Sequence, residues 1–204
     1  MSVRTHRAEP LAAGDRRRAI VDAVVPLLVD RGASVTTREM AEAAGIAEGT
    51  IFRVFPDKCA LIHEAVRVTL DPAPYLERLA RIDHDATLEE QLLEATRTLL
   101  ERSQAVVALL AVLHTMPLPS TEDAAVWPPR FVTEAHGAVS GALTALFERH
   151  RDRLAVEPAR AAVALRGLVL ASVHPAVARS ERLTAEEIVR LLVGGISKAK
   201  GETG

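Results

Sequence analysis

The sequence has few aromatic residues, a single cysteine and no long apolar run. Phe, Trp and Tyr make up 3% of its 204 residues, which leaves few rings for base stacking and argues against a reader of RNA or single-stranded DNA. Cys59 stands alone, so internal disulfides and cysteine-rich zinc folds are excluded. A hydrophobic share of 49% and a charged share of 25% suffice for one or two small domains with a buried core.

The longest stretch without an acidic or basic residue does not predict a membrane span. Residues 103–121 form this stretch, but they include His114, Pro117 and Pro119 and are too interrupted to cross a bilayer. Charged residues precede the first apolar run, so we expect no secretory signal. We therefore expect a soluble cytoplasmic protein that makes no membrane contact.

The positive charge is concentrated at the N-terminus. Residues 1–18 hold five arginines against two acidic residues, whereas residues 19–204 hold 20 basic and 25 acidic side chains. A basic arm on an acidic protein suggests that a small part of the surface meets a polyanion. A solvated leader explains the same charges.

Apolar residues recur at spacings of three and four almost throughout, as in Leu88, Leu92 and Leu99, which is the period of an α-helix. No segment has the pattern of a strand, so we predict an all-α fold. Glycines, prolines and polar clusters divide the chain into about nine helices. The expected breaks are Gly32, Gly45, Pro56, and residues 71–74, 82–87, 117–129 and 156–158.

Residues 36–61 carry the most informative pattern. Thr36 and Glu39 form a capping box, so a helix is expected to begin at Thr37. Gly45 comes where the chain must leave this helix through a positive φ angle, and Ile46 follows as a core residue. A second helix is expected directly afterwards. The pattern is that of a helix-turn-helix, although any two helices joined by a glycine turn would share much of it.

The second helix of this pattern, residues 48–55, has two distinct faces. Ile51, Val54 and Phe55 should face inward. The outward side chains are expected to be those of Glu48, Gly49, Thr50, Phe52 and Arg53. In a helix-turn-helix such side chains reach base edges in the major groove of double-stranded DNA.

Residues 15–66 resemble the DNA-binding domain of the tetracycline-repressor (TetR) family. The resemblance is carried by the spaced residues Gly45, Ile46, Gly49, Thr50, Ile51, Phe52, Phe55 and Lys58. It implies a three-helix helix-turn-helix domain at residues 15–66, preceded by a flexible basic arm at residues 1–14. It also implies a helical ligand-binding and dimerisation bundle at residues 67–204.

The resemblance also implies which residues contact DNA. They are Thr37, Arg38, Ala47, Glu48, Gly49, Thr50, Phe52, Arg53 and Lys58. The charges of Arg16, Arg17 and Arg18 at the start of the first helix could also bind phosphate, although a plain solvated helix start would explain them as well. Thr37, Arg38 and Lys58 would contact phosphate, and Arg53 could bind guanine through both ends of its guanidinium. Three residues depart from the family pattern, and one of them is Pro26, which should kink the first helix and concerns its packing rather than the motif. Ala47 cannot cap the second helix through its side chain, and Phe52 lacks the hydroxyl of the commoner tyrosine.

The C-terminal part is less specific in sequence. Small residues Ala164, Gly167 and Ala171 form one stripe, and the last helix carries another, so two helices from each chain could form a homodimer interface. The second stripe consists of Ile188, Leu191, Leu192 and Gly195. Both stripes would also fit an ordinary core. An apolar or aromatic effector would be bound by Leu109, Leu113, His114, Met116, Trp127, Phe131, Leu168 and Ser172, and each of these also fits ordinary packing.

Enzymatic and metal-binding functions have little support in the sequence. Ser140 stands one place late for a G-x-S-x-G nucleophile elbow, and no P-loop or dinucleotide fingerprint occurs. The seven histidines lack metal-ligand spacing, so we expect no metal and no cofactor. The favoured hypothesis is a ligand-responsive repressor that binds a palindromic operator as a homodimer. An activator with the same head and a helical interaction protein that does not bind DNA remain as alternatives.

Overall fold

The computed structural model describes residues 13–116, 129–178 and 182–196. Within these ranges the chain forms nine α-helices, two short 3₁₀ helices and no strand, which confirms the predicted all-α fold. The head consists of α1 (Ala13–Arg31), η1 (Gly32–Ser34), α2 (Thr37–Ala43), α3 (Glu48–Val54) and α4 (Lys58–Leu70). The bundle consists of α5 (Ala73–Ala80), α6 (Leu88–His114), α7 (Pro129–Glu148), η3 (Arg151–Arg153), α8 (Pro158–Val173) and α9 (Ala185–Ile196). None of these helices is long and apolar enough to cross a membrane.

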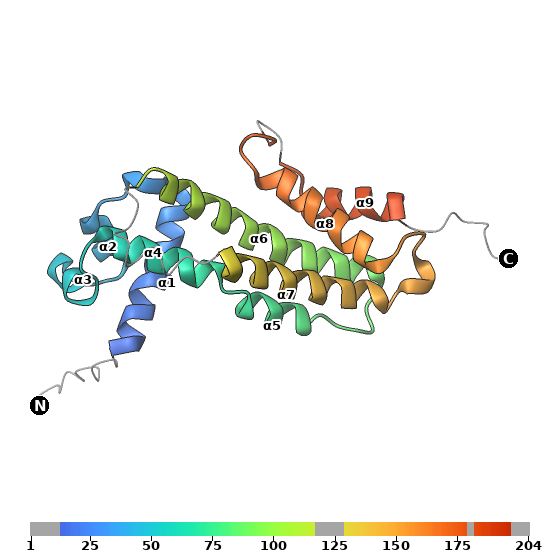
Figure 1. Ribbon diagram of the computed structural model, residues 1–204, viewed down its shortest axis with the longest axis horizontal. Coiled ribbons are helices and arrows are strands. Elements are labelled where there is room, and N and C mark those ends of the chain that lie inside the picture. The colour runs from blue at the N-terminus through green and yellow to red at the C-terminus, as the bar shows by residue number, and fades with distance from the viewer. Residues whose placement is uncertain (1–12, 117–128, 179–181, 197–204) are drawn as a thin grey trace, which may run out of the picture.

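The helices of the head close around one hydrophobic core at the end of the molecule that carries the N-terminus (Figure 1). Val24 and Leu28 of α1, Met40 of α2 and Ile51 of α3 are fully buried there. Each side chain of this size contributes about 1.5 to 3 kcal/mol to folding when it leaves water. Helix α3 is only seven residues long, so its position depends on this packing rather than on its own helix propensity.

The helices of the bundle enclose a second core. Leu88 and Leu92 of α6, Leu143 and Phe147 of α7, and Leu165 of α8 are all fully buried in it. Helix α8 packs on α6 and α7, and α9 covers both α6 and α8. Among the described residues, one long side of α8 has no neighbouring helix, and Val163 and Leu170 on it are exposed.

Helix α6 belongs to both cores. Its 27 residues extend about 40 Å at 1.5 Å per residue, and Figure 1 shows it running the length of the bundle to the head. Leu92 lies in the bundle core, whereas Leu109 and Val112 lie in the head core. The boundary expected between residues 66 and 67 falls inside α4, because that helix continues to Leu70 and Leu70 packs in the head core.

Tyr75 on α5 has an unusual environment in the bundle core. The residue is 4% exposed, and its hydroxyl has no hydrogen-bond partner among the described residues. Burial raises the pKa of the Tyr75 hydroxyl far above its ordinary value, so the group is neutral at all physiological pH values. A buried hydroxyl without a partner loses its hydrogen bonds to water and gains none in exchange.

Replacing Tyr75 by phenylalanine should therefore stabilise the protein. We expect Tyr75→Phe to raise the free energy of unfolding by about 1 kcal/mol, since the ring contacts remain and the desolvation cost disappears. Urea unfolding followed by circular dichroism measures the change. Tyr75→Leu, which removes the ring and leaves a cavity, should be destabilising and serves as the control. A destabilised Tyr75→Phe variant would contradict the expectation.

Candidate nucleic-acid interface

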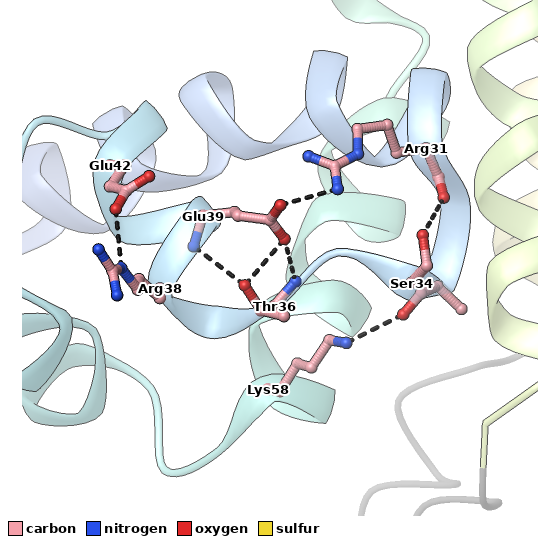
Figure 2. A network of polar contacts seen from close by, with 8 residues as sticks. Arg31, Ser34, Thr36, Arg38, Glu39, Glu42 and Lys58 are labelled. Atoms are coloured by element: carbon pink, nitrogen blue, oxygen red, sulfur yellow. Dashed lines mark hydrogen bonds and ion pairs between the residues drawn. The ribbon is translucent and has the colours of Figure 1, made fainter.

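The first helix of the helix-turn-helix begins at the predicted capping box. The Thr36 side chain accepts a hydrogen bond from the Glu39 backbone N–H at 3.3 Å, and the Glu39 carboxylate accepts one from the Thr36 backbone N–H at 2.8 Å. Arg31 approaches the same carboxylate to 2.7 Å. Figure 2 shows these three residues joined in one network. The box fixes the residue at which α2 starts and ties it to the end of α1.

The turn between α2 and α3 depends on Gly45. Its φ angle is 64°, as the sequence predicted, and the next residue, Ile46, donates a backbone hydrogen bond to Ala41 at 3.0 Å. Only glycine adopts this backbone conformation without strain. Ala47 then precedes α3 and provides no side-chain cap, as expected. The turn therefore sets the angle between the two helices through its backbone.

Helix α3 presents one face to the core and the other to solvent. Ile51 and the following Phe55 are fully buried, while Phe52 is 48% exposed, which is high for a large aromatic residue. Arg53 is also exposed, and within the described ranges its guanidinium has no hydrogen-bond or ion-pair partner. Of the remaining residues assigned to this face, Glu48 and Gly49 are exposed and Thr50 is half-buried, and Ala47, which precedes the helix, is exposed.

The candidate residues on α2 are engaged by acidic neighbours. The Thr37 hydroxyl donates to the Glu48 carboxylate at 2.6 Å, which joins the start of α2 to the start of α3. Arg38 donates to Glu42 at 3.0 Å, and this bond raises the pKa of Arg38. Arg38 is nevertheless 79% exposed, and exposed ion pairs contribute little to stability. Its guanidinium is therefore available to a phosphate at low cost.

The structure separates the three arginines that begin α1. Arg17 donates to the carbonyl of Val54 at 3.1 Å and lies 4.3 Å from the centre of the Phe55 ring. It therefore holds the C-terminal end of α3 against α1. Arg18 forms an ion pair with Asp22 at 3.0 Å, and Arg16 is exposed. The expected DNA contacts of the basic arm fall on residues 1–12, which lie outside the described ranges.

Lys58 lies at the start of α4 and is half-buried. Its ammonium group donates to the carbonyl of Ala33 at 3.0 Å, close to the α2 network in Figure 2. An ammonium has three protons, so this bond leaves two for another acceptor. Lys58 thus connects the start of α4 to the residues before α2, which is a second role beside the expected phosphate contact.

The candidate ligand-binding residues that the structure describes lie in two separate parts of the molecule. Leu109, Leu113 and Met116 pack in or against the head core, because the last turns of α6 are buried there. Leu168 packs against the bundle core, and the buried Ser172 donates to its carbonyl at 3.1 Å. Of the other three candidates, His114 is exposed, Trp127 lies outside the described residues, and Phe131 is on α7 without a described side chain.

The described residues do form a hollow elsewhere, between the end of α5 and the start of α6. It encloses about 380 Å³ and is lined mainly by charged and polar side chains, among them Arg78, Arg81 and Glu94. Nothing in the sequence pattern pointed to it. Across the described ranges, no three His, Cys, Asp or Glu side chains come together in a way that could hold a metal ion.

The two stripes predicted to form the dimer interface differ in their exposure to solvent. On α8, Ala164 and Gly167 are exposed and Ala171 is half-buried, and they are flanked by Val163 at 67% and Leu170 at 53% exposure. The α9 stripe is split. Its residues Ile188 and Leu192 lie in the bundle core, which corrects their assignment to an interface, whereas Leu191 and Gly195 are exposed. The apolar outer face therefore consists mainly of α8.

Comparison with known proteins gives matches to the head and to the whole fold. Residues 20–65 match the model of the family described as bacterial regulatory proteins, tetR family. The HTH-type transcriptional repressor KstR2 of Rhodococcus jostii (strain RHA1) is 34% identical over 98 residues, which are 46% of this chain and 48% of that protein. The chain thus aligns with about half the length of this curated relative.

Solved structures resemble the chain over most of its length. The TetR transcriptional regulator SCO0520 from Streptomyces coelicolor has 22% identity and a TM-score of 0.58, covering 90% of this chain and 99% of that one. AibR in complex with isovaleryl coenzyme A and operator DNA has 21% identity and a TM-score of 0.54, covering 89% and 98%. The ketosteroid transcriptional regulator KstR2 of Mycobacterium tuberculosis has 19% identity and a TM-score of 0.54, covering 90% and 96%. At these identities the likeness concerns the fold.

The capping box should make stability depend on pH. Hydrogen bonds from Thr36 and Arg31 lower the pKa of Glu39 from 4.5 to about 2, so its stabilising effect is complete above its ordinary pKa and is lost as the pH falls towards 2. Glu39→Gln cannot titrate. We therefore expect the stability difference between wild type and Glu39→Gln, measured by urea unfolding, to shrink as the pH is lowered from about 6 to 3. Glu42→Gln controls for net charge, and a difference independent of pH would contradict the assignment.

Proposed function

We propose, from the premise that the head of this chain belongs to the tetR family of bacterial regulatory proteins, that the protein is a ligand-responsive transcriptional regulator. It binds a palindromic operator in double-stranded DNA as a homodimer and acts in the cytoplasm. The observation that carries the proposal is α3, a short helix fixed by its buried face. Its outer face exposes Phe52 and Arg53, and Arg53 has no hydrogen-bond or ion-pair partner among the described residues. A repressor is the favoured form, as the curated relative is a transcriptional repressor.

The geometry of the head suits insertion of α3 into the major groove. Its position at the end of the molecule leaves it accessible to a duplex (Figure 1). Arg53 can donate two hydrogen bonds to guanine, and Phe52 can contact a thymine methyl or the sugar backbone. Arg38 on α2 and Lys58 at the start of α4 would hold phosphates. These contacts fix register and sequence preference together.

A second copy of the chain is expected on the outer face of α8. Val163, Leu170 and Leu191 are all more than half exposed, and exposed apolar side chains that gather in one patch are typical of a protein–protein interface. Small residues between them would allow two α8 helices to approach closely. A twofold dimer carries two α3 helices and so reads a palindrome with both.

We propose that the effector binds in the bundle and is an apolar or aromatic small molecule. In the structure of AibR that protein holds isovaleryl coenzyme A together with operator DNA, and this supports a small-molecule effector for the same fold. An effector that favours one arrangement of the two heads changes DNA affinity by the coupling free energy, commonly about 1 to 3 kcal/mol. We propose no catalytic role.

Replacing Arg53 should weaken binding to the operator. We expect Arg53→Ala to lose about 1 to 3 kcal/mol, roughly 5- to 150-fold in Kd, because it removes contacts to a base edge. Fluorescence anisotropy on DNA from beside the protein's own gene, repeated at several salt concentrations, measures the change. Arg81→Ala, an exposed arginine on the bundle, is the matched control and should bind as wild type does.

Two results would contradict this proposal. If Arg53→Ala and Arg81→Ala bind DNA equally well, α3 is not the reading element. If the wild-type protein shows no salt-dependent DNA affinity even at low ionic strength, the chain is a helical interaction protein that does not bind DNA.

A charge on the outer face of α8 should break the dimer. We expect Leu170→Arg to weaken dimerisation by about 2 kcal/mol or more, since a central apolar contact is replaced by a desolvated cation. Sedimentation velocity over a range of protein concentrations measures the shift to monomer. Ala80→Arg places the same charge on an exposed site of α5 and should leave the dimer intact. A Leu170→Arg protein that sediments as wild type would place the interface elsewhere.

A further inference from the structure

The C-terminal end of α4, the last helix of the head, is held by the side chain of Arg102 from α6. Helix α4 terminates at Leu70, where its last carbonyls have no partners within the helix. Arg102 of α6 donates to the carbonyls of Thr69 at 3.1 Å, Leu70 at 2.7 Å and Asp71 at 2.7 Å. One guanidinium thus holds three successive carbonyls at the end of α4.

The same guanidinium also contacts the start of the bundle. Its central carbon lies 5.8 Å from the centre of the Tyr75 ring on α5. Asp71, whose carbonyl it holds, accepts a hydrogen bond through its side chain from the backbone N–H of Ala73, the first residue of α5. Arg102 is partly buried, and burial lowers its pKa, while the negative ends of the carbonyl dipoles favour the cation. Three helices, α4, α5 and α6, therefore meet at Arg102.

The meeting point of α4, α5 and α6 at Arg102, called the joint below, lies where it can set the orientation of the head. Helix α4 starts directly after α3 and crosses the head to Arg102, and Figure 1 shows α3 at the outer end of the head, away from the bundle. A small rotation at the joint therefore displaces α3 by a larger distance. The apolar contacts of Leu109 and Val112 also connect α6 to the head, but such contacts have little directional preference. The planar fork of an arginine does have one.

We propose that Arg102 is a positioning residue that fixes the angle between head and bundle, and thereby the separation of the two α3 helices in the dimer. The inference rests on the proposed function. It concerns the regulation of DNA binding: Arg102 selects the half-site spacing that the dimer accepts, whereas the side chains of α3 select the sequence. Lysine cannot replace it, because an ammonium is a point charge that does not define a direction across three carbonyls.

The experiment measures the preference for half-site spacing separately from the affinity for the half-site sequence. The preferred site is first selected from a random duplex library with the wild-type protein. Duplexes are then made that contain one half-site, or two half-sites whose separation differs from the preferred one by one to four base pairs. Affinities are measured for the wild type, Arg102→Lys and Arg102→Met. Arg97→Lys is the matched control, since Arg97 lies on the same helix and pairs with Glu186 at 2.7 Å, away from the joint.

We expect the wild type and Arg97→Lys to bind the preferred spacing much more tightly than the others. In both Arg102 variants, the ratio between the affinities for the preferred spacing and for the other spacings should fall by about fivefold or more, which is the lower end of the usual coupling between sites. Their affinity for a single half-site should stay within about twofold of the wild-type value. Circular dichroism shows whether each variant is folded.

Three results would overturn the inference. A wild-type spacing preference in both Arg102 variants would show that the joint does not set the separation. A parallel loss of half-site affinity in Arg102→Lys would show that the residue only stabilises the head. A wild-type protein that selects no sequence would refute the proposed function itself, and the inference with it.

Discussion

The arrangement of this protein depends on the burial of one helix in two cores. Helix α6 places Leu92 in the bundle and Leu109 and Val112 in the head, so neither core is complete without it. Apolar burial at both ends makes the two units cooperative, because separating them would expose fully buried leucine side chains to water. A change in the angle of the head would therefore have to rearrange contacts that this helix makes.

The polar surface of the head carries both cations, which would attract a polyanion, and carboxylates, which would repel it. Thr37 and Arg38 are both engaged by carboxylates, those of Glu48 and Glu42, whereas Arg53 is exposed. Carboxylates near a phosphate chain oppose binding and so reduce affinity for unselected DNA. In the proposed function, a larger share of the binding free energy would then come from the few side chains of α3 that contact bases.

The sequence predicted what is decided locally. The capping box at Thr36 and the positive φ angle at Gly45 each follow from residues within one turn of the chain, and both are present. What it could not predict depends on distant packing. Arg17 is used to hold Val54, 37 residues away, and no local pattern distinguishes it from its neighbours. The same holds for Ile188, whose apolar spacing fits a core as well as an interface.

Gly45 shows how a position can be constrained without being crowded. A Cβ added there would meet no atom within 4 Å apart from its chain neighbours, so crowding does not exclude a side chain. The restriction comes only from its torsion angle of 64°. Asparagine, which enters the left-handed region more readily than other residues, should be tolerated better than the smaller alanine. Size is therefore a poor guide to which relatives can keep this turn, and backbone preference is a good one.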